Sequence, residues 1–406
     1  MKIHTYIFLF LFAHFAQAQQ NIQLPACAKP ELNRLHFSAD SSAFMRLFSK
    51  MDALQKDEIT RISIVHFGGS HIQAGIWSNA FSSSFQTQYA KMGGGYFGFP
   101  YKLAKTNGQY YFSTYSSSRW KKCRAVSADY CLPLGMSGLS ISTNDSVGNF
   151  GAALNQRSAC RFVNKVKVYH NFNPSFSFSL VATQAGTIER IDNIPEGYSL
   201  FSFENPIDSV PFVFTRKDTN QRDFILYGIS LENDLVPGIY LAALGMNGAS
   251  ATSILRASEL TRQLPSLKAD LYFISYGVND TQAADFSAEK FYKNYDSLIR
   301  TIQAISPDAA IVLTTTTDNY IRGKTLNKKT AIARDVMFQL MNDRHVAVWD
   351  MYEIMGGPKS IIKWAQAGMA SKDRVHFTTK GYNALGQLMY QAFQDAYNQS
   401  RKSLPQ

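Results

Sequence analysis

The spacing of apolar residues changes along the chain and predicts regions of different structure. In 41–55, apolar residues recur about every three to four positions, which predicts an amphipathic helix. The run 61–67 is almost continuously apolar and predicts a buried strand, and a second helix is expected from about 71 to 91. Strand, turn and helix in this order are the building block of a parallel α/β sheet.

Between about 110 and 233 the apolar period becomes two. The segments 165–168 and 175–180 alternate cleanly, whereas 199–203 and 210–214 are short aromatic runs bounded by turn residues. Several such strands without helices between them predict an antiparallel sandwich or jelly roll.

After Pro237 and Gly238 the α/β pattern returns. Four further apolar runs predict buried strands, and helices are expected around them. The strands are 239–244, 271–276, 310–314 and 345–349, and the helices are 249–263, 288–305 and 379–397.

Together these patterns predict an α/β protein with a second, inserted domain. A doubly wound domain with a five-stranded parallel sheet is expected from 36–108 and 236–400, and an antiparallel β-sandwich from 109–235. The chain has 406 residues, 45% of them apolar and 13% aromatic, which is ample for two cores and excludes a disordered chain.

The first 18 residues have the features of a secretory signal peptide. Lys2 precedes the apolar segment 7–13, and an A-x-A cleavage motif stands at 16–18. The apolar segment is shorter than the roughly 20 residues that a membrane-spanning helix needs, and no other segment comes close. We therefore expect an exported, soluble mature chain without a membrane span, periplasmic or extracellular in a bacterium. The segment 24–27 only faintly resembles a lipoprotein box, because polar residues separate it from the apolar segment.

The charge of the chain is +11, from 41 Lys and Arg against 30 Asp and Glu. No run of five or more basic residues exists, which argues against a nucleic-acid partner. The surplus of positive charge is compatible with attraction to an acidic polymer such as a cell wall.

Four cysteines occur, and export permits disulfides among them. Cys27, Cys123, Cys131 and Cys160 allow three full pairings and contain no C-x-x-C motif, so a zinc site is not expected. We expect one local disulfide, joining Cys123 to Cys131 or to Cys160.

Candidate chemistry lies at the ends of the predicted parallel strands, where ligands bind in open sheets. Ser70 follows the first strand, Gly248 the second and Asn279 the third, while Asp373 and His376 precede the last helix. A serine hydroxyl needs an adjacent base to act as a nucleophile. His376 can be that base, with its tautomer fixed by Asp373. The backbone N–H groups of Ser70 and Gly248 and the carboxamide of Asn279 would form an oxyanion hole.

Each of these residues also has a simpler interpretation. Ser70 could be a helix N-cap, Gly248 a turn glycine and Asn279 a turn residue. Only their combination favours acyl transfer. Asp280 is expected to be structural and to bond local backbone groups.

Other motifs are weaker. His66 and His71 are expected to pack or support the site, because no third metal ligand stands at useful spacing, and we expect neither a metal nor a cofactor. The segment 93–98 matches G-x-G-x-x-G, but it follows a predicted helix and precedes Pro100, so a flexible loop near the site is expected rather than a dinucleotide site. The motif G-x-S-x-G fails at Ser70, which argues against an ordinary α/β-hydrolase.

The sequence resembles the SGNH hydrolases, also called GDSL esterases. Four residues match, in order, the blocks that name this family: Ser70, Gly248, Asn279 and His376. The segments 277–280 and 373–376 match their blocks in full, and the resemblance covers most of the chain outside the insertion. It implies a flavodoxin-like α/β/α fold with Ser70 as nucleophile, His376 as base and Asp373 as the orienting carboxylate, together with the oxyanion hole described above.

The Ser70-His71 pair and the inserted β-domain are similar to bacterial peptidoglycan O-acetylesterases and related exported carbohydrate esterases. One position departs from the family pattern, because Gly69 stands where the first block usually has Asp. That carboxylate lies outside the triad, so the resemblance still implies nucleophilic catalysis, with a less firmly held Ser70 loop.

The expected function is that of an exported serine esterase that removes O-acetyl groups from a polysaccharide, with peptidoglycan first. The alternatives are an O-acetyltransferase with the same triad and an inactive glycan-binding protein. Sandwich domains often bind carbohydrate through exposed aromatics, and Tyr110, Tyr111, Tyr115 and Trp120 are candidates, although an inward orientation is favoured for them. The oligomeric state is left open.

Overall fold

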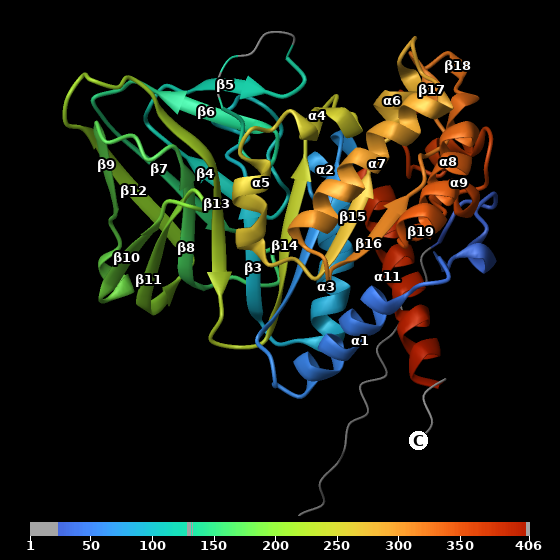
Figure 1. Ribbon diagram of the computed structural model, residues 1–406, viewed down its shortest axis with the longest axis horizontal. Coiled ribbons are helices and arrows are strands. Elements are labelled where there is room, and N and C mark those ends of the chain that lie inside the picture. Colours follow the sequence, from blue (N-terminus) through green and yellow to red (C-terminus); the bar gives the residue numbers. More distant parts are fainter. Residues whose placement is uncertain (1–22, 128–130, 132, 403–406) are drawn as a thin grey trace, which may run out of the picture.

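The computed structural model describes residues 23–127, 131 and 133–402. The predicted signal peptide lies outside the described residues. The described chain forms one large mixed sheet, which is covered by helices in one half and by a smaller second sheet in the other (Figure 1).

The α/β half is built on six parallel strands in the order β19-β16-β15-β2-β14-β3. Five are the predicted strands: β2 (Arg61–Gly68), β14 (Gly238–Gly245), β15 (Leu271–Ser275), β16 (Ala310–Thr314) and β19 (Ala347–Trp349). The short β1 (Leu35–Phe37) pairs antiparallel with β19 at the edge. The predicted fold class, an α/β sheet with an additional antiparallel β part, is confirmed.

The sixth parallel strand corrects one prediction. β3 (Gly93–Gly98) covers the glycine motif for which a flexible loop was expected, and it pairs with β14 on one side and with β13 (Phe224–Asn233) on the other. A Cβ atom at Gly93 would lie 1.8 Å from the Val236 carbonyl oxygen. The missing side chains therefore allow close backbone packing at the centre of the sheet.

Helices cover both faces of the parallel strands. The long ones are α1 (Ser42–Gln55), α3 (Ile76–Tyr89), α7 (Ala288–Ile305), α8 (Lys329–Arg344) and α11 (Thr379–Lys402). The short ones near the sheet edge are α6 (Val278–Gln282), α9 (Met351–Ile354) and α10 (Ser360–Gln366), and a small hairpin is formed by β17 (Tyr320–Ile321) and β18 (Thr325–Leu326).

Two predicted helices are each divided. The expected helix 71–91 consists of α2 (Ser70–Gln73) and α3, which are separated at Gly75, where φ is +68°. The expected helix 249–263 consists of α4 (Ala251–Leu255) and α5 (Leu260–Gln263). Both breaks leave a short helix directly behind a strand end.

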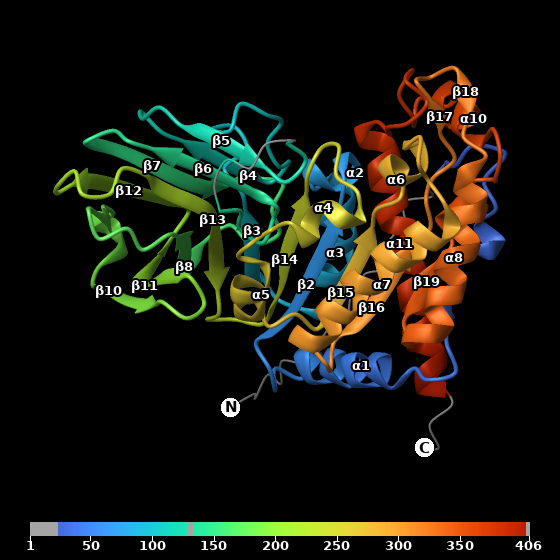
Figure 2. The same cartoon turned by 45° about the horizontal axis from the view of Figure 1, so that its top comes forward.

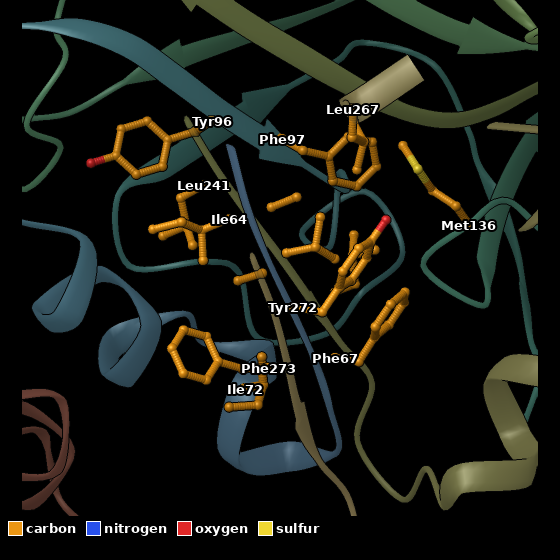
Figure 3. Close-up of a cluster of buried hydrophobic side chains, with 14 of the residues drawn as sticks. Ile64, Phe67, Ile72, Tyr96, Phe97, Met136, Leu241, Leu267, Tyr272 and Phe273 are labelled. Carbon is orange, nitrogen blue, oxygen red and sulfur yellow. The ribbon is translucent and has the colours of Figure 1, made fainter. Parts of the chain in front are cut away.

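Aromatic side chains fill the core on both faces of the parallel sheet. Figure 3 shows Phe67 and Tyr272 together on one side of the strands and Phe273 with Ile72 on the other. The rings of Phe67 and Tyr272 stack with centroids 6.2 Å apart, and Phe273 meets Phe81 of α3 edge-on at 4.9 Å. Burial of both faces explains why these strands are apolar without alternation.

The β half packs a four-stranded antiparallel sheet against an extension of the large sheet. The small sheet has the order β4 (Phe112–Tyr115), β7 (Val147–Leu154), β12 (Ser209–Arg216) and β9 (Phe176–Leu180). The extension consists of β13, β8 (Val163–His170), β11 (Tyr198–Ile207) and β10 (Ile188–Asn193). In addition, β6 (Leu139–Thr143) pairs with β13, and β5 (Lys121–Arg124) pairs with β6. Because β13 pairs with β3, this sandwich shares its main sheet with the α/β half.

Phenylalanines join the two sheets of the sandwich. Phe150 of β7 stacks on Phe212 at 5.0 Å and also meets Phe224 of β13 at 6.0 Å. Of the four aromatic candidates near the entry of the insertion, Tyr111 is fully buried, whereas Tyr115 is 44% exposed. The predicted inward orientation thus holds for Tyr111 and not for Tyr115.

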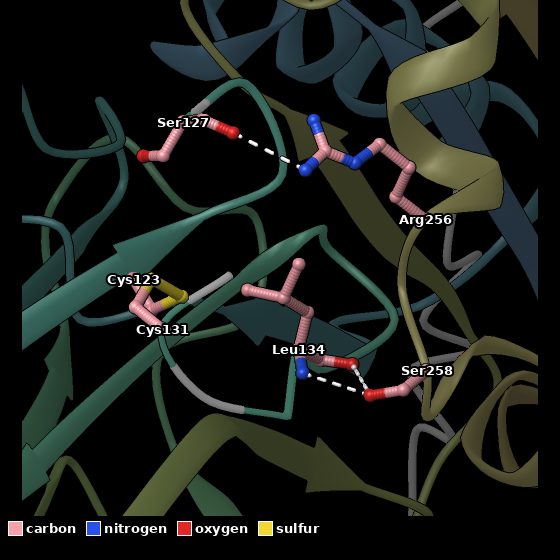
Figure 4. The surroundings of a disulfide bond; sticks show 6 residues. All are labelled: Cys123, Ser127, Cys131, Leu134, Arg256 and Ser258. Atoms are coloured by element: carbon pink, nitrogen blue, oxygen red, sulfur yellow. Dashed lines mark hydrogen bonds between the residues drawn. A yellow bond between two sulfur atoms is a disulfide. The ribbon is translucent and has the colours of Figure 1, made fainter. Parts of the chain in front are cut away.

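The expected local disulfide is confirmed, and it joins Cys123 and Cys131 (Figure 4). Cys27 and Cys160 are free cysteines. Within the part of the chain that the structure describes, every helix is too short or too polar to cross a bilayer.

Candidate active site

Three loops meet at one edge of the parallel sheet. β15, β2 and β14 are neighbours, and their carboxyl ends lead into α6, α2 and α4, which Figures 1 and 2 show at the same end of the strands. Ser70 is the first residue of α2, Gly248 lies between β14 and α4, and Asn279 lies in α6. The common direction of the strands therefore gathers residues that are far apart in the sequence.

The fourth predicted segment reaches this edge from the turn before α11. Ser70 Oγ lies 2.7 Å from His376 Nε2, and His376 Nδ1 lies 2.7 Å from Asp373 Oδ2. The second oxygen of Asp373 accepts hydrogen bonds from the backbone N–H groups of Val375 and His376, at 2.9 and 3.0 Å. Hydroxyl, imidazole and carboxylate form a continuous chain, the arrangement that can activate a serine.

The Asp373 carboxyl is held in its ionised form. Burial by itself would raise its pKa, but hydrogen bonds from the side chain and backbone of His376 and from the Val375 backbone outweigh burial and lower the pKa below its usual value. A carboxylate next to Nδ1 favours a proton on that nitrogen, which leaves Nε2 able to accept the Ser70 proton.

The candidate oxyanion donors Gly248 and Asn279 follow β14 and β15, the two strands that flank the strand leading to Ser70. Gly248 has φ of +83°, and a Cβ atom there would meet no other atom within 4 Å, so this side of the residue faces open space. Asn279 donates one amide hydrogen of Nδ2 to the Ala249 carbonyl at 2.8 Å, which fixes the carboxamide and leaves a second hydrogen for an oxyanion.

Asp280 holds two of the loops together. Its carboxylate accepts from the backbone N–H of Gly277 at 3.1 Å and from that of Ala251 at 3.3 Å, which connects the start of α6 with the start of α4. Burial raises the pKa of this carboxyl to about 6, against the opposing effect of these hydrogen bonds. Asp280 thus bonds the local backbone at Gly277 as expected, and it also bonds the distant backbone at Ala251.

A cavity of about 190 Å³ adjoins Gly248 and Asn279. It lies between α4, α6 and the start of α7, and most of its lining is polar. The remaining lining residues are Ser250, Thr252, Asp280, Ala283, Asp285, Phe286, Ser287, Lys290, Phe291 and Asn294. Its hydroxyl, amide and charged side chains can bond a hydroxyl-rich group, and Phe286 and Phe291 add apolar surface beside them.

Comparisons with known proteins agree with the fold. Residues 223–384 match the model of the GDSL-like Lipase/Acylhydrolase family. A solved peptidoglycan O-acetylesterase superposes with a TM-score of 0.69 at 17% identity, over 90% of this chain and 99% of that one. The resemblance to SGNH hydrolases is confirmed.

Other matches are shorter. A lipase/acylhydrolase from Enterococcus faecalis has a TM-score of 0.32 at 20% identity, over 39% of this chain and 77% of its own. An acetyl xylan esterase has a TM-score of 0.31 at 20% identity, over 38% of this chain and 80% of its own. No curated protein sequence matches the chain. The match to the family model supports an acylhydrolase, and the O-acetylesterase structure shows the same fold over nearly the whole chain.

Gly69, the departure from the family pattern, leaves the Ser70–His376 hydrogen bond in place. A Cβ atom at Gly69 would lie 3.2 Å from the Ala249 carbonyl oxygen and 3.3 Å from Asn279 Nδ2. A side chain at this position would therefore press on the carboxamide of Asn279. In this chain the Ala249 carbonyl is the group that fixes Asn279.

His71 packs at the site, as expected, and its contact there is with the imidazole of His376. Its ring is buried with its centroid 5.3 Å from that of His376, and its Nδ1 lies 2.9 Å from the Tyr382 hydroxyl. Burial, and then the proximity of His376, lower the pKa of His71 to about 3. A neutral ring therefore packs against the candidate base.

His66 is also a packing group. It lies between Ser78 and Ser275, at 2.9 and 2.7 Å, in the core under α3. Across the described ranges, no three His, Cys, Asp or Glu side chains gather as they would around a metal ion.

Two further residues near the site belong to no sequence motif. Gln73 accepts a hydrogen bond from the Asn247 backbone N–H at 2.8 Å, and Arg124 of β5 donates to the Asn247 carbonyl. No periodicity or spacing connects either residue with the loop at 246–250, because both contacts arise from tertiary packing.

Proposed function

We propose that this protein is an exported serine esterase that removes O-acetyl groups from a polysaccharide, with peptidoglycan as the first candidate. The observation that carries the proposal is the hydrogen-bonded chain Ser70–His376–Asp373, whose serine stands at the same sheet edge as the loops of Gly248 and Asn279. The match to an acylhydrolase family model and the fold shared with a peptidoglycan O-acetylesterase support it.

The reaction follows from the positions of these groups. Ser70 Oγ attacks the acetyl carbonyl carbon while His376 Nε2 takes the hydroxyl proton, and Asp373 stabilises the resulting imidazolium. The oxyanion accepts hydrogen bonds from the backbone N–H groups of Ser70 and Gly248 and from Asn279 Nδ2.

Collapse of this intermediate breaks the ester C–O bond, and His376 returns the proton to the departing sugar oxygen. An acetyl group is then bound to Ser70 Oγ. Water, deprotonated by His376, attacks the acetyl-enzyme and releases acetate, which restores the Ser70 hydroxyl.

A sugar as the alcohol is supported by the pocket. Its lining of hydroxyl, amide and carboxylate groups suits a hydroxyl-rich ring, and Phe286 adds an apolar surface. The net charge of +11 favours approach to an acidic wall polymer.

Export is supported by the signal-like segment at 1–18 and by the Cys123–Cys131 disulfide. Disulfides persist in oxidising compartments such as the periplasm and the cell exterior.

The test is acetate release from O-acetylated peptidoglycan, xylan and alginate by the wild type and by Ser70→Ala. The wild type should act fastest on peptidoglycan, and Ser70→Ala should release none because the nucleophile is gone. Ser297→Ala, which removes an exposed hydroxyl on α7, is the matched control and should keep the wild-type rate.

Equal release by the wild type and Ser70→Ala would refute the serine mechanism. Transfer of acetyl to an added glycan, without free acetate, would identify a transferase. No turnover of any ester by the wild type would identify an inactive binding protein.

A further inference from the structure

A side chain of the β half is hydrogen-bonded to the candidate oxyanion loop. Arg124, the last residue of β5, donates a hydrogen bond from Nη2 to the carbonyl oxygen of Asn247, which is 123 positions further along the chain. Asn247 directly precedes Gly248, whose N–H is a candidate oxyanion donor.

The carbonyl that Arg124 binds belongs to the same peptide group as the Gly248 N–H. No peptide bond in the described chain is cis, so the Asn247 carbonyl and the Gly248 N–H point in opposite directions within one plane. A donor that fixes the carbonyl therefore also fixes the direction of the N–H. A charged donor additionally polarises the peptide group and strengthens the N–H as a hydrogen-bond donor.

The neighbouring N–H groups already have acceptors. Met246 N–H donates to the Gly68 carbonyl at 3.1 Å, Asn247 N–H to Gln73 Oε1 at 2.8 Å, and Ala249 N–H to the Met246 carbonyl at 3.0 Å. Within the described residues, the Gly248 N–H has no acceptor. The backbone N–H groups before and after Gly248 are thus held by hydrogen bonds, and in the described part of the chain the Gly248 N–H between them is free.

We propose that Arg124 is a positioning residue that directs the Gly248 N–H into the oxyanion hole, so that the inserted β-domain takes part in the active site. This rests on the proposed function, since it assigns a supporting residue to the same hole. Arg124 itself does not touch the substrate.

The segment that carries Arg124 is fastened at several points. The disulfide from Cys123 to Cys131 closes a loop that begins next to Arg124 and contains it. Further along, Ser258 Oγ accepts from the Leu134 N–H at 3.0 Å, and Arg256 donates to the Ser127 carbonyl at 3.2 Å (Figure 4). Arg124 itself is held by its pairing with Leu139 of β6 and by the disulfide at the adjacent Cys123. The contacts of Ser127 and Leu134 join the segment after Arg124 to the chain that follows α4.

Arg256 provides a matched control. It also donates from a guanidinium to a backbone carbonyl in this contact region, but its acceptor, Ser127, lies in the insertion and not in the 246–250 turn. Loss of Arg256 should loosen the contact region without releasing the Asn247–Gly248 peptide.

The first measurement is hydrolysis of a small chromogenic acetate ester by Arg124→Met, Arg124→Lys and Arg256→Met. Arg124→Met should lower kcat about 10-fold to 100-fold with little change in KM, because a misdirected donor weakens binding of the transition state rather than the substrate. Arg124→Lys keeps a charged donor and should recover most of the loss. Arg256→Met should keep the wild-type kcat.

The second measurement needs no activity. Labelling with ¹³C′-Asn and ¹⁵N-Gly selects the two Asn-Gly pairs of the chain, Asn107-Gly108 and Asn247-Gly248. Arg124→Met should shift the Asn247-Gly248 cross-peak and leave the other, which serves as an internal reference. Arg256→Met should shift neither.

The results separate the two proposals. Wild-type kcat in folded Arg124→Met, or an equal loss in Arg256→Met, would overturn the role of Arg124, as would an unmoved Asn247-Gly248 cross-peak. An inactive wild type whose Asn247-Gly248 cross-peak still moves in Arg124→Met would refute the esterase and leave the Arg124 contact with the turn established.

Discussion

The two halves of the molecule share a sheet but differ in where they place polar groups. In the α/β half all strands of the parallel part end at one edge, so the loops after β2, β14 and β15 meet there. In the β half neighbouring strands run in opposite directions, so consecutive loops alternate between two ends. Parallel strands therefore concentrate chemistry at one edge, and an antiparallel sandwich contributes to it through a side contact such as that of Arg124.

The largest effect expected from this contrast concerns the α/β half. Asp373→Asn should lower kcat about 10³-fold to 10⁴-fold, because a carboxamide can present N–H to His376 Nδ1 and favour the wrong tautomer. Steady-state hydrolysis of an acetate ester measures this. Asp335→Asn, at an exposed position on α8, should keep the wild-type rate. A loss of less than 10-fold for Asp373→Asn would place the carboxylate outside the mechanism.

The next largest effect concerns the β half, where we expect a lower free energy of unfolding. Phe150 is fully buried between the two sheets of the sandwich, and Phe150→Ala should cost about 3–5 kcal/mol of unfolding free energy. Val147→Ala is the control, because Val147 lies on the same strand and is 68% exposed. Urea unfolding followed by fluorescence and by residual activity measures both.

Since β13 and β3 join the halves in one sheet, Phe150→Ala should shift both signals together. A variant in which the sandwich unfolds first while activity persists would show that the two halves are energetically independent despite the shared sheet.

The smallest expected effect concerns Asp280, which lies at the sheet edge of the candidate site, and the dependence of stability on pH. The pKa of Asp280 in the folded state is about 6, above the ordinary value of 3.8, so the folded state holds this proton more tightly than the unfolded state. Its contribution to stability is therefore greatest below pH 4 and is lost as pH rises to about 6, by about 3 kcal/mol at most. Asp280→Asn removes this titration and keeps one acceptor oxygen.

The difference in unfolding free energy between wild type and Asp280→Asn should therefore change between pH 4 and pH 7 in favour of the variant. Urea unfolding at both pH values measures it, and a difference that is independent of pH would contradict a raised pKa.

The sequence by itself determined the elements that depend on local pattern. Burial on both faces gives continuous apolar runs, as in β2, β14, β15, β16 and β19. Burial on one face gives the alternation seen in the sandwich. Both patterns are visible in neighbouring residues of a single segment. The motif residues Ser70, Gly248, Asn279, Asp373 and His376 stand directly behind strands or before the last helix, so their order along the chain already indicated a common edge.

Only the tertiary structure decided what depends on residues far apart in the chain. The glycines of β3 predicted a loop, because close packing against β13 and β14 is not visible in a local pattern. The contact of His71 with His376 and the bond from Arg124 to Asn247 likewise join distant segments. Such contacts depend on which surfaces meet when the sheet is assembled. The spacing of residues along one segment does not indicate which distant segment will pack against it.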